Sequence, residues 1–406
     1  MARITAVVAI YEVAPYLDKC LASLQAQTFG DIDVVIVDDG STDGSRAIAE
    51  RYAERDGRFR VISQPNRGLG NARNAGVAAA TGEFLSFVDG DDALPPDAYA
   101  RLLASLDRTG SDFAAGHVHR FTSTRTWPAP FLAKTFRRNR PTTHVTRFRW
   151  LLADRMAQNK LWRRSFWEQH VLRFREGCLH EDIPVVVPAQ FLARSVDVLA
   201  APVYLYRERE DGDRSITQRR TELRSLRDRV AAVEDARAQI ARVAGSAAVR
   251  RYDESVVEQD LLYHLDVFDQ GDAEYRQAFL DAATAFLDRA GPGIEDRLPA
   301  IQRLKWHLVR RRLEPQLLEV LRFQREELRS NPKRVIAGRV YGDYPFLGDP
   351  AVAVPRRIYR LDTTRRRIAH AVTLLKPSRV PARDRAPRAR SWRASPPSHG
   401  GAVSGR

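Results

Sequence analysis

The apolar run at residues 84–88 is followed at once by Asp89, Asp91 and Asp92, which place three carboxylates within four positions. A run of this length and composition is typical of a buried strand. Carboxylates this close together repel one another unless water or a cation surrounds them. Two interpretations are therefore open: a solvated acidic turn, or an Asp-x-Asp pair whose oxygens bind Mg²⁺ or Mn²⁺.

The first 120 residues alternate between apolar runs of strand length and segments with helical spacing. We expect strands at 4–11, 34–37, 60–62, 84–88 and 112–115, with helices between them. This alternation predicts an α/β fold whose mostly parallel sheet is covered on both faces. Ligands bind such sheets at the carboxyl ends of the strands. Because Asp38-Asp39 and the cluster at 89–92 both follow strands, they should face one crevice, which favours the metal interpretation.

The rest of the chain changes character twice. Residues 121–148 are polar and basic without a clear period, and we expect an irregular stretch that crosses the site, with a further strand at 198–206. Helical spacing then predicts helices at about 221–243, 250–269, 273–289 and across 298–329. The predicted parts are an α/β domain at 1–218, a helical linker or accessory region at 219–330, the start of a β-containing accessory domain at 331–376 and a disordered basic tail at 377–406.

The composition is that of a globular protein, but the net charge of +15 is unusual. Such a charge favours nucleic acid, an anionic membrane surface or a polyanionic substrate as a partner. The two cysteines, Cys20 and Cys178, have neither disulfide-framework nor metal-site spacing, which favours a reducing cytosol. No stretch approaches 18 apolar residues, so we expect any membrane association to be peripheral.

Two other clusters could contact a nucleotide. Asp38-Asp39 could accept hydrogen bonds from a base edge or a ribose hydroxyl, although alone such a pair is more often a helix N-cap. In the segment 66–74, small residues and Arg73 stand at a predicted helix start, which favours a phosphate. A Gly-rich loop with a surface arginine is the alternative for that segment.

A fourth cluster is His180-Glu181-Asp182. A carboxylate here could act as general base toward a hydroxyl acceptor, or could simply belong to the acid-rich first turn of a helix. His180 could orient the pair or touch phosphate, and metal ligation by it is not expected, because no second His or Cys stands at ligand spacing.

The ordered set of motifs within residues 3–215 resembles family 2 glycosyltransferases of the GT-A fold. The motifs are Tyr11, Val37-Asp38-Asp39-Gly40-Ser41-Thr42-Asp43, Asn66-Arg67-Gly68, Ala72-Arg73-Asn74-Ala75-Gly76, Phe87-Val88-Asp89-Gly90-Asp91-Asp92 and Glu181-Asp182. The resemblance implies a nucleotide-diphospho-sugar donor, most simply a UDP-sugar, with Mn²⁺ or Mg²⁺ as cofactor, and inverting transfer of a hexosyl or N-acetylhexosaminyl group. The chain departs from the family pattern in Ala9 and Glu12, which stand where Pro and Asn are usual.

Carried over to this sequence, the resemblance assigns two sets of residues. On the donor side, Tyr11 and Asp39 would contact the nucleoside, Asn66 and Arg73 the base or diphosphate region, Asp89 the ribose or metal shell, and Asp91 the metal. On the acceptor side, Asp182 would be the general base with Glu181 beside it, and Asp92, Lys160, His180, Arg207 and Arg209 would contact sugar hydroxyls, phosphate or an anionic acceptor.

The helical region and Tyr341-Gly342-Asp343-Tyr344-Pro345-Phe346-Leu347 are similar to the linker and first accessory segment of wall-teichoic-acid-type glycosyltransferases. That similarity implies a role in cell-wall biogenesis, with a polyol-phosphate or other anionic cell-envelope polymer as acceptor. The cysteine content and the net charge of +15 favour a cytoplasmic protein, with peripheral contact to the inner face of the plasma membrane through the basic C-terminal part. No nucleic acid is expected as a partner.

Two other classes of function compete with this interpretation. A nucleotidyltransferase would carry a Gly-rich loop with Arg or Lys just after the first strand, where Tyr11-Glu12-Val13-Ala14-Pro15 stands instead. A non-catalytic protein that binds anionic polymers would depend on the basic tail, so deletion of 377–406 would abolish its function but spare the turnover of an enzyme.

Overall fold

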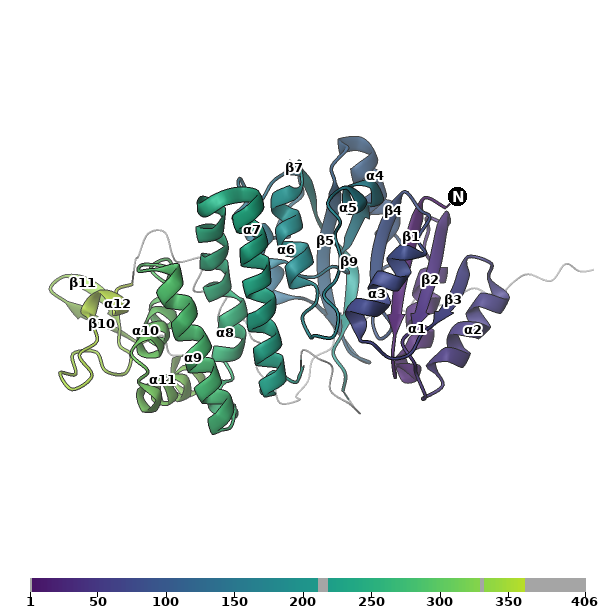
Figure 1. The fold of residues 1–406 in the computed structure, drawn as a ribbon. Helices are drawn as coiled ribbons and strands as arrows, with labels where there is room; N and C mark the ends of the chain where they lie inside the picture. The colour runs from purple at the N-terminus through teal and green to yellow at the C-terminus, as the bar shows by residue number, and fades with distance from the viewer. Residues whose placement is uncertain (1, 211–217, 329–331, 362–406) are drawn as a thin grey trace, which may run out of the picture.

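The computed structural model of the chain describes residues 2–210, 218–328 and 332–361. The predicted basic tail at 377–406 lies outside the described residues. The α/β part stands at one end of the molecule and the helical region at the other (Figure 1).

A nine-stranded sheet forms the α/β part. Its strands are β1 (Ile4–Ile10), β2 (Ile32–Asp38), β3 (Phe59–Ser63), β4 (Phe84–Asp89), β5 (Phe113–Phe121), β6 (Thr126–Pro128), β7 (Arg140–Thr143), β8 (Lys160–Arg163) and β9 (Val196–Arg207). The strand order is β3-β2-β1-β4-β8-β5-β9-β7, with β6 added to β5. Pairing is parallel from β3 to β4 and between β5 and β9, while β8 runs antiparallel between β4 and β5.

Helices cover this sheet, as the alternating pattern predicts. They are α1 (Ala14–Gln25), α2 (Ser45–Arg55), α3 (Leu69–Ala78), α4 (Ala98–Thr109), α5 (Arg164–Gln169) and α6 (Ile183–Leu192). Every residue of β1 is buried, which explains why the central strands are continuous apolar runs rather than alternating ones. The predicted α/β class is therefore confirmed.

The segment 121–148 is more regular than the sequence predicts. It contains β6, a short 3₁₀ turn at Pro130–Leu132 and β7. The strand predicted at 112–115 continues to Phe121, and β6 pairs with its last three residues. The prediction of an irregular stretch holds for most of the segment. It missed the two short strands because the apolar periodicity is weak, whereas pairing with β5 and β9 supplies their hydrogen bonds.

The helical region follows the sequence prediction closely. It consists of α7 (Leu223–Glu258), α8 (Asp260–Leu265), α9 (Ala273–Ala290), α10 (Ala300–Arg310) and α11 (Glu314–Glu326). The break predicted between 243 and 250 lies at Gly245, whose φ of 76° interrupts α7. Buried apolar residues of this region and of the sheet belong to one continuous core. In the described residues, no helix is long and apolar enough to cross a membrane.

The last described segment is short. A two-stranded sheet pairs β10 (Lys333–Ile336) with β11 (Arg339–Gly342), and α12 (Arg356–Tyr359) follows. The strand-like pattern at 341–347 extends the strand only to Gly342, since Tyr344 packs on Phe323 of α11 and the backbone turns there.

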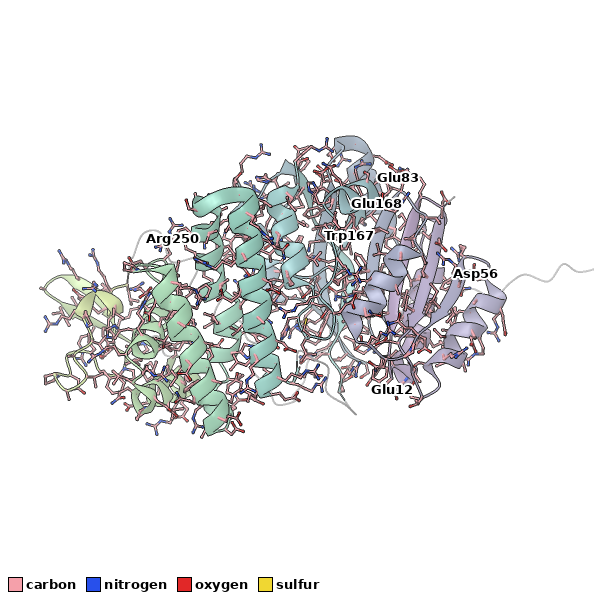
Figure 2. All side chains as sticks on the ribbon, viewed as in Figure 1. Glu12, Asp56, Glu83, Trp167, Glu168 and Arg250 are labelled. Carbon is pink, nitrogen blue, oxygen red and sulfur yellow. The ribbon has the colours of Figure 1, made fainter. Side chains whose placement is uncertain are left out.

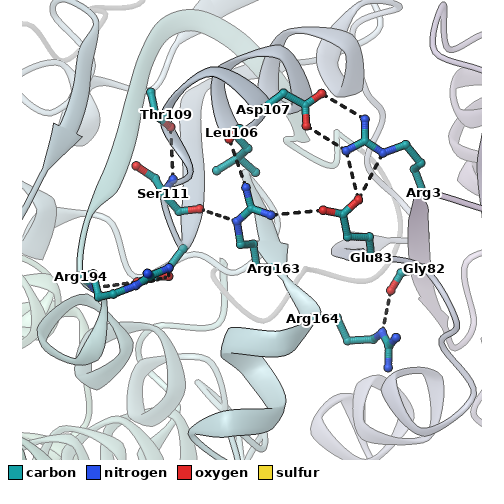
Figure 3. A network of polar contacts seen from close by, with 11 residues as sticks. Arg3, Gly82, Glu83, Leu106, Asp107, Thr109, Ser111, Arg163, Arg164 and Arg194 are labelled. Atoms are coloured by element: carbon teal, nitrogen blue, oxygen red, sulfur yellow. Dashed lines mark hydrogen bonds and ion pairs between the residues drawn. The ribbon is translucent and has the colours of Figure 1, made fainter.

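An ion-pair network closes the amino-terminal edge of the sheet (Figure 3). Glu83 accepts from Arg3 at 3.1 Å and from Arg163 at 3.2 Å, while Arg3 also pairs with Asp107 at 2.8 Å. Glu12, just after β1, lies at the opposite end of the sheet (Figure 2). The acidic clusters described next lie at this carboxyl end of the sheet, away from the ion-pair network.

Candidate active site

Strand register brings the acidic clusters together at the carboxyl edge. In the pairing of β1 with its two neighbours, Ile10 lies opposite Asp38 and Ala9 lies opposite Asp89. Asp38 and Asp89 thus flank the end of the same central strand. The register places both clusters at the same end of the sheet, and that they face one crevice stays a prediction.

Asp39 is buried and joins two loops of the crevice. Its Oδ1 accepts from the Arg67 amide at 3.0 Å and the Gln64 amide side chain at 2.7 Å, and its Oδ2 accepts from the Gly68 amide at 2.8 Å. Asn66 and Tyr11 are exposed beside these loops. Asp39 therefore fixes the rim that would receive a nucleoside, and direct nucleoside contact by these three residues stays a prediction.

Glu12 departs from the family pattern without placing a free charge in the crevice. Its backbone φ is 51°, and Oε1 accepts from the Thr42 amide at 2.7 Å and the Thr42 hydroxyl at 3.0 Å. The carboxylate is thereby used to hold the loop after β2.

Arg73 is the buried cation that links the acidic clusters. Its Nη2 lies 2.6 Å from Asp89 Oδ1, and its Nη1 lies 2.5 Å from Glu181 Oε1. The backbone at Arg175 can approach α3 this closely only because residue 70 is a glycine: a Cβ at Gly70 would stand 2.1 Å from the Arg175 carbonyl oxygen. The surface-arginine alternative is therefore excluded, while a phosphate contact of Arg73 stays a prediction.

Two residues that the sequence analysis missed complete this network. Gln158 donates to Asp89 Oδ2 at 2.7 Å. The Tyr204 hydroxyl donates to Asp92 Oδ2 at 2.7 Å and accepts from the Asp89 amide at 3.1 Å. Tyr204 lies inside the strand predicted at 198–206, and Gln158 lies in a stretch without a predicted strand, so no motif distinguishes either from a packing residue.

Arg207 and Arg209 cross over the acids that follow β4. Arg209 donates through Nε and Nη2 to Asp91 Oδ2, at 2.9 and 2.7 Å. Arg207 donates from its amide to Asp92 Oδ1 at 2.7 Å and from Nε to the Asp91 carbonyl at 2.5 Å. Burial raises the pKa of Asp91 against the effect of Arg209, and raises that of Asp92 well above its usual range, with Asp91 and Asp89 adding to it. The two arginines thus partly neutralise a strongly acidic pocket.

The carboxylates of Asp89 and Asp91 are the candidate ligands for a divalent cation. In residues 2–210, 218–328 and 332–361, no group of three or more His, Cys, Asp or Glu residues could hold a metal ion. Both oxygens of Asp89 are hydrogen-bonded, whereas the bonds from Arg209 to Asp91 end on Oδ2 and leave Oδ1 for another ligand. Mg²⁺ is commonly held by one or two carboxylates together with substrate phosphates. The residues therefore fit a metal that binds with a diphosphate, through Asp91.

Glu181 and Asp182 differ in how they are held. Glu181 is buried against Arg73, and burial raises its pKa to about 7, with Arg73 opposing the rise and Asp182 adding to it. Burial also raises the pKa of Asp182, against the opposing charges of Arg73 and Arg229. Within the described part of the chain, Asp182 has no side-chain ion pair, so its carboxylate is the one available to take a proton.

The raised pKa of Glu181 predicts a stability effect with a definite sign. The folded protein holds this proton up to about pH 7, whereas an unfolded Glu loses it near 4.5. Between those values the folded state binds more protons, so the free energy of unfolding should fall as pH rises. We expect Glu181→Gln to flatten this slope in urea unfolding measured from pH 4.5 to 7.5, and an unchanged slope would contradict it.

Lys160 and His180 are held by the protein itself. Lys160 is buried, and Nζ donates to Asp154 at 2.6 Å, to the Met156 carbonyl at 2.5 Å and to Asn159 at 3.0 Å. These three bonds use every ammonium hydrogen, so Lys160 has none left for a phosphate. The His180 ring lies 3.3 Å from the Ser225 hydroxyl, and burial lowers its pKa well below the usual range, which keeps it neutral.

Residues 5–170 match the sequence profile described as glycosyl transferase family 2. This part of the chain is therefore a family 2 glycosyltransferase domain, as the ordered motifs predict.

Comparison with individual proteins agrees. EpsH and EpsJ of Bacillus subtilis, both named as glycosyltransferases, are 38% identical over 208 residues and 36% identical over 214 residues. Each alignment covers 50% of this chain, and 60% or 61% of the relative. The chain thus spans about three fifths of the length of these curated relatives.

A solved structure extends the likeness of fold. The crystal structure of residues 1–349 of S. aureus TarS in complex with UDP-GlcNAc has a TM-score of 0.64 at 19% identity. The match covers 84% of this chain and 97% of that one, so it continues beyond the α/β part into the helical region. The predicted GT-A fold is therefore confirmed.

Proposed function

We propose that the chain is an inverting glycosyltransferase that moves a sugar from a nucleotide-diphospho-sugar to a hydroxyl acceptor. One observation carries this proposal: of the two carboxylates at the start of α6, Glu181 is tied to Arg73, while Asp182 has no side-chain ion pair in the described part of the chain. One acid is thus left for proton transfer, beside a separate set of acids and arginines after β4.

The acids and arginines after β4 suit the nucleotide-diphospho-sugar donor. Asp39, Tyr11 and Asn66 would receive the nucleoside, and Asp91, with Asp89 oriented by Arg73, would hold Mn²⁺ or Mg²⁺ together with the diphosphate. When bound, the cation supplies positive charge to the leaving nucleoside diphosphate. Arg207 and Arg209 lie beside the same acids and add to that charge.

Asp182 would supply the other half of the reaction. Its carboxylate accepts the proton of the acceptor hydroxyl as that oxygen attacks the anomeric carbon. The bond from the anomeric carbon to the diphosphate oxygen breaks at the same time, and its electron pair leaves with the nucleoside diphosphate. A single displacement from the opposite face inverts the anomeric configuration.

The substrates are proposed from charge and from likeness. The fold of S. aureus TarS in complex with UDP-GlcNAc supports a UDP-sugar donor and transfer of a hexosyl or N-acetylhexosaminyl group. The net charge of +15 supports an anionic or polyol-containing cell-envelope polymer as acceptor, and peripheral contact with an anionic leaflet at the inner face of the plasma membrane.

Asp91→Ala should weaken Mn²⁺-dependent donor binding. Because this substitution removes the carboxylate that has an oxygen left for a metal, we expect UDP-GlcNAc turnover in Mn²⁺ to fall by about 10²-fold or more. Released UDP measures turnover, and calorimetry with and without EDTA measures donor binding. Asp97→Ala is the matched control, because Asp97 is an acid of the same loop that pairs with Arg101 at a more exposed position.

The same experiment separates the competing functions. Donor binding that is unaffected by both EDTA and Asp91→Ala would remove the metal assignment. Release of pyrophosphate from a nucleoside triphosphate, instead of UDP from a UDP-sugar, would favour a nucleotidyltransferase. Retention of an anionic polymer without turnover of any nucleotide sugar would favour a binding protein.

A further inference from the structure

Helix α7 of the helical region lies along the segment that carries Glu181 and Asp182. Ser225 contacts His180 at 3.3 Å, and Asp228 accepts from the Leu179 amide at 2.9 Å. About three turns further along, Gln239 donates to the Pro184 carbonyl at 3.0 Å. The turn is therefore held on both sides by side chains that lie outside the predicted α/β domain at 1–218.

A buried group of three charges stands behind this turn. Asp260 of α8 is fully buried and accepts from Arg155 at 2.5 Å and from Arg229 of α7 at 3.0 Å. Arg229 Nη1 also lies 3.5 Å from His180 Nδ1, and its guanidinium lies 4.5 Å from the Tyr263 ring centroid. One carboxylate between two guanidiniums leaves a net charge of +1, which a buried site tolerates only beside an anion.

The neighbouring anion is the proposed base. Burial raises the pKa of Asp182, and Arg229 is one of two arginines whose charge opposes that rise. Because His180 is kept neutral, it does not add a charge of its own between Arg229 and the acids. The charged and titratable groups that face Asp182 from every packed element are Arg73 of α3, Asp89 of β4, Lys160 of β8, Arg229 of α7, and His180 and Glu181 of its own turn.

The backbone gives a second reason for a brace at this point. His180 has a φ of 61°, a left-handed conformation that is strained for a non-glycine residue and persists only where surrounding contacts hold it. The ring contacts to Ser225 and Arg229 are such contacts, and the residue that follows is Glu181.

We propose that Arg229 is a positioning residue for the proposed base: held by Asp260, it braces the His180 turn and supplies the positive charge that keeps the Asp182 carboxylate ionised. The inference rests on the proposed function, in which Asp182 takes the proton of the acceptor. It makes α7 and α8 part of the catalytic unit rather than a separate accessory region.

Opposite changes of charge distinguish this role from a merely structural one. In Arg229→Gln the base loses a cation, so the acid limb of kcat/KM for UDP-GlcNAc in Mn²⁺ should move to higher pH, with about a tenfold loss on that limb and little loss on the plateau above it. In Asp260→Asn two guanidiniums lack their counter-charge, and the limb should move to lower pH. Arg229→Lys should restore the wild-type limb. Arg237→Gln, which breaks the Arg237–Asp253 pair elsewhere on α7, should leave it in place.

A readout without turnover keeps the two proposals apart. The ¹³C NMR signal of the Asp182 carboxyl carbon, assigned by its loss in Asp182→Asn, should titrate at higher pH in Arg229→Gln and at lower pH in Asp260→Asn. An unmoved titration in a folded Arg229→Gln, or shifts of the same sign in both variants, overturns the positioning role. Should Arg229→Gln not fold, Asp260→Asn decides, since a shift to higher pH or no shift overturns it. A moved titration together with unimpaired turnover of Asp182→Asn overturns the proposed function instead.

Discussion

Asp182→Asn should lower kcat for sugar transfer by about 10²–10⁴-fold, the range that general acid–base catalysis contributes. The substitution keeps the shape of the side chain but removes its ability to accept a proton. Because Asp182 is not part of the ion pairs that hold Asp89 and Glu181, donor affinity and folding should change little. UDP release with a polyol-phosphate acceptor measures kcat, and calorimetry with UDP-GlcNAc measures donor affinity.

Glu181→Gln is the informative comparison, since it changes the adjacent carboxylate. Glu181 is paired with Arg73, so we expect its loss to disturb the site less than the loss of the base. Asp235→Asn, which alters an exposed ion pair with Arg175, serves as control. If Glu181→Gln abolished transfer while Asp182→Asn retained it, the assignment of the base would pass to Glu181.

The place of the acidic site could be predicted because strand geometry is local. Each acid follows an apolar run, and parallel pairing then aligns the strand ends without any further information. Asp38 and Asp89 accordingly flank the end of β1. A helix break between 243 and 250 could be predicted for a similar reason, since it depends on the spacing within one segment, and the structure places it at Gly245.

The counter-charges could not be predicted in the same way. Arg73 and Glu181 are 108 positions apart, and the distance between them follows from how α3 and α6 pack rather than from any motif. The resemblance assigns Lys160 to phosphate or an anionic acceptor, whereas in the structure its ammonium group donates to Asp154. That partner could not be predicted, because Asp154 precedes Lys160 by six positions in a stretch without a recognisable pattern.

The helical region shows where sequence spacing stops being informative. Amphipathic spacing predicts that α7 packs against something, and it does not say what. In the structure the polar side of α7 carries Ser225, Asp228 and Arg229 to the turn at 179–182. The predicted boundary at 218 stays a prediction, but contacts of this kind argue that an isolated 1–218 fragment would lack support for its proposed base.

Arg73→Ala should be among the most destabilising single substitutions in the chain. Removing one partner of a buried ion pair leaves an uncompensated charge, which typically costs about 3–5 kcal/mol. Here two carboxylates, Asp89 and Glu181, lose the same fully buried cation. The loss in free energy of unfolding should be largest at pH 8 and smaller at pH 5, because the pKa of Glu181, already about 7, rises further without Arg73 and protonation then relieves the repulsion.

Two comparisons make this prediction specific to the buried charges. Arg58→Ala removes the more exposed partner of Asp56 and should cost only about 0–1 kcal/mol. The double variant Arg73→Ala/Glu181→Gln removes one of the two stranded carboxylates, so urea unfolding at pH 8 should find it more stable than Arg73→Ala alone. If the second substitution gave no recovery, the cost of losing Arg73 would come from lost packing, such as its contact with the Phe174 ring, and not from the charges it neutralises.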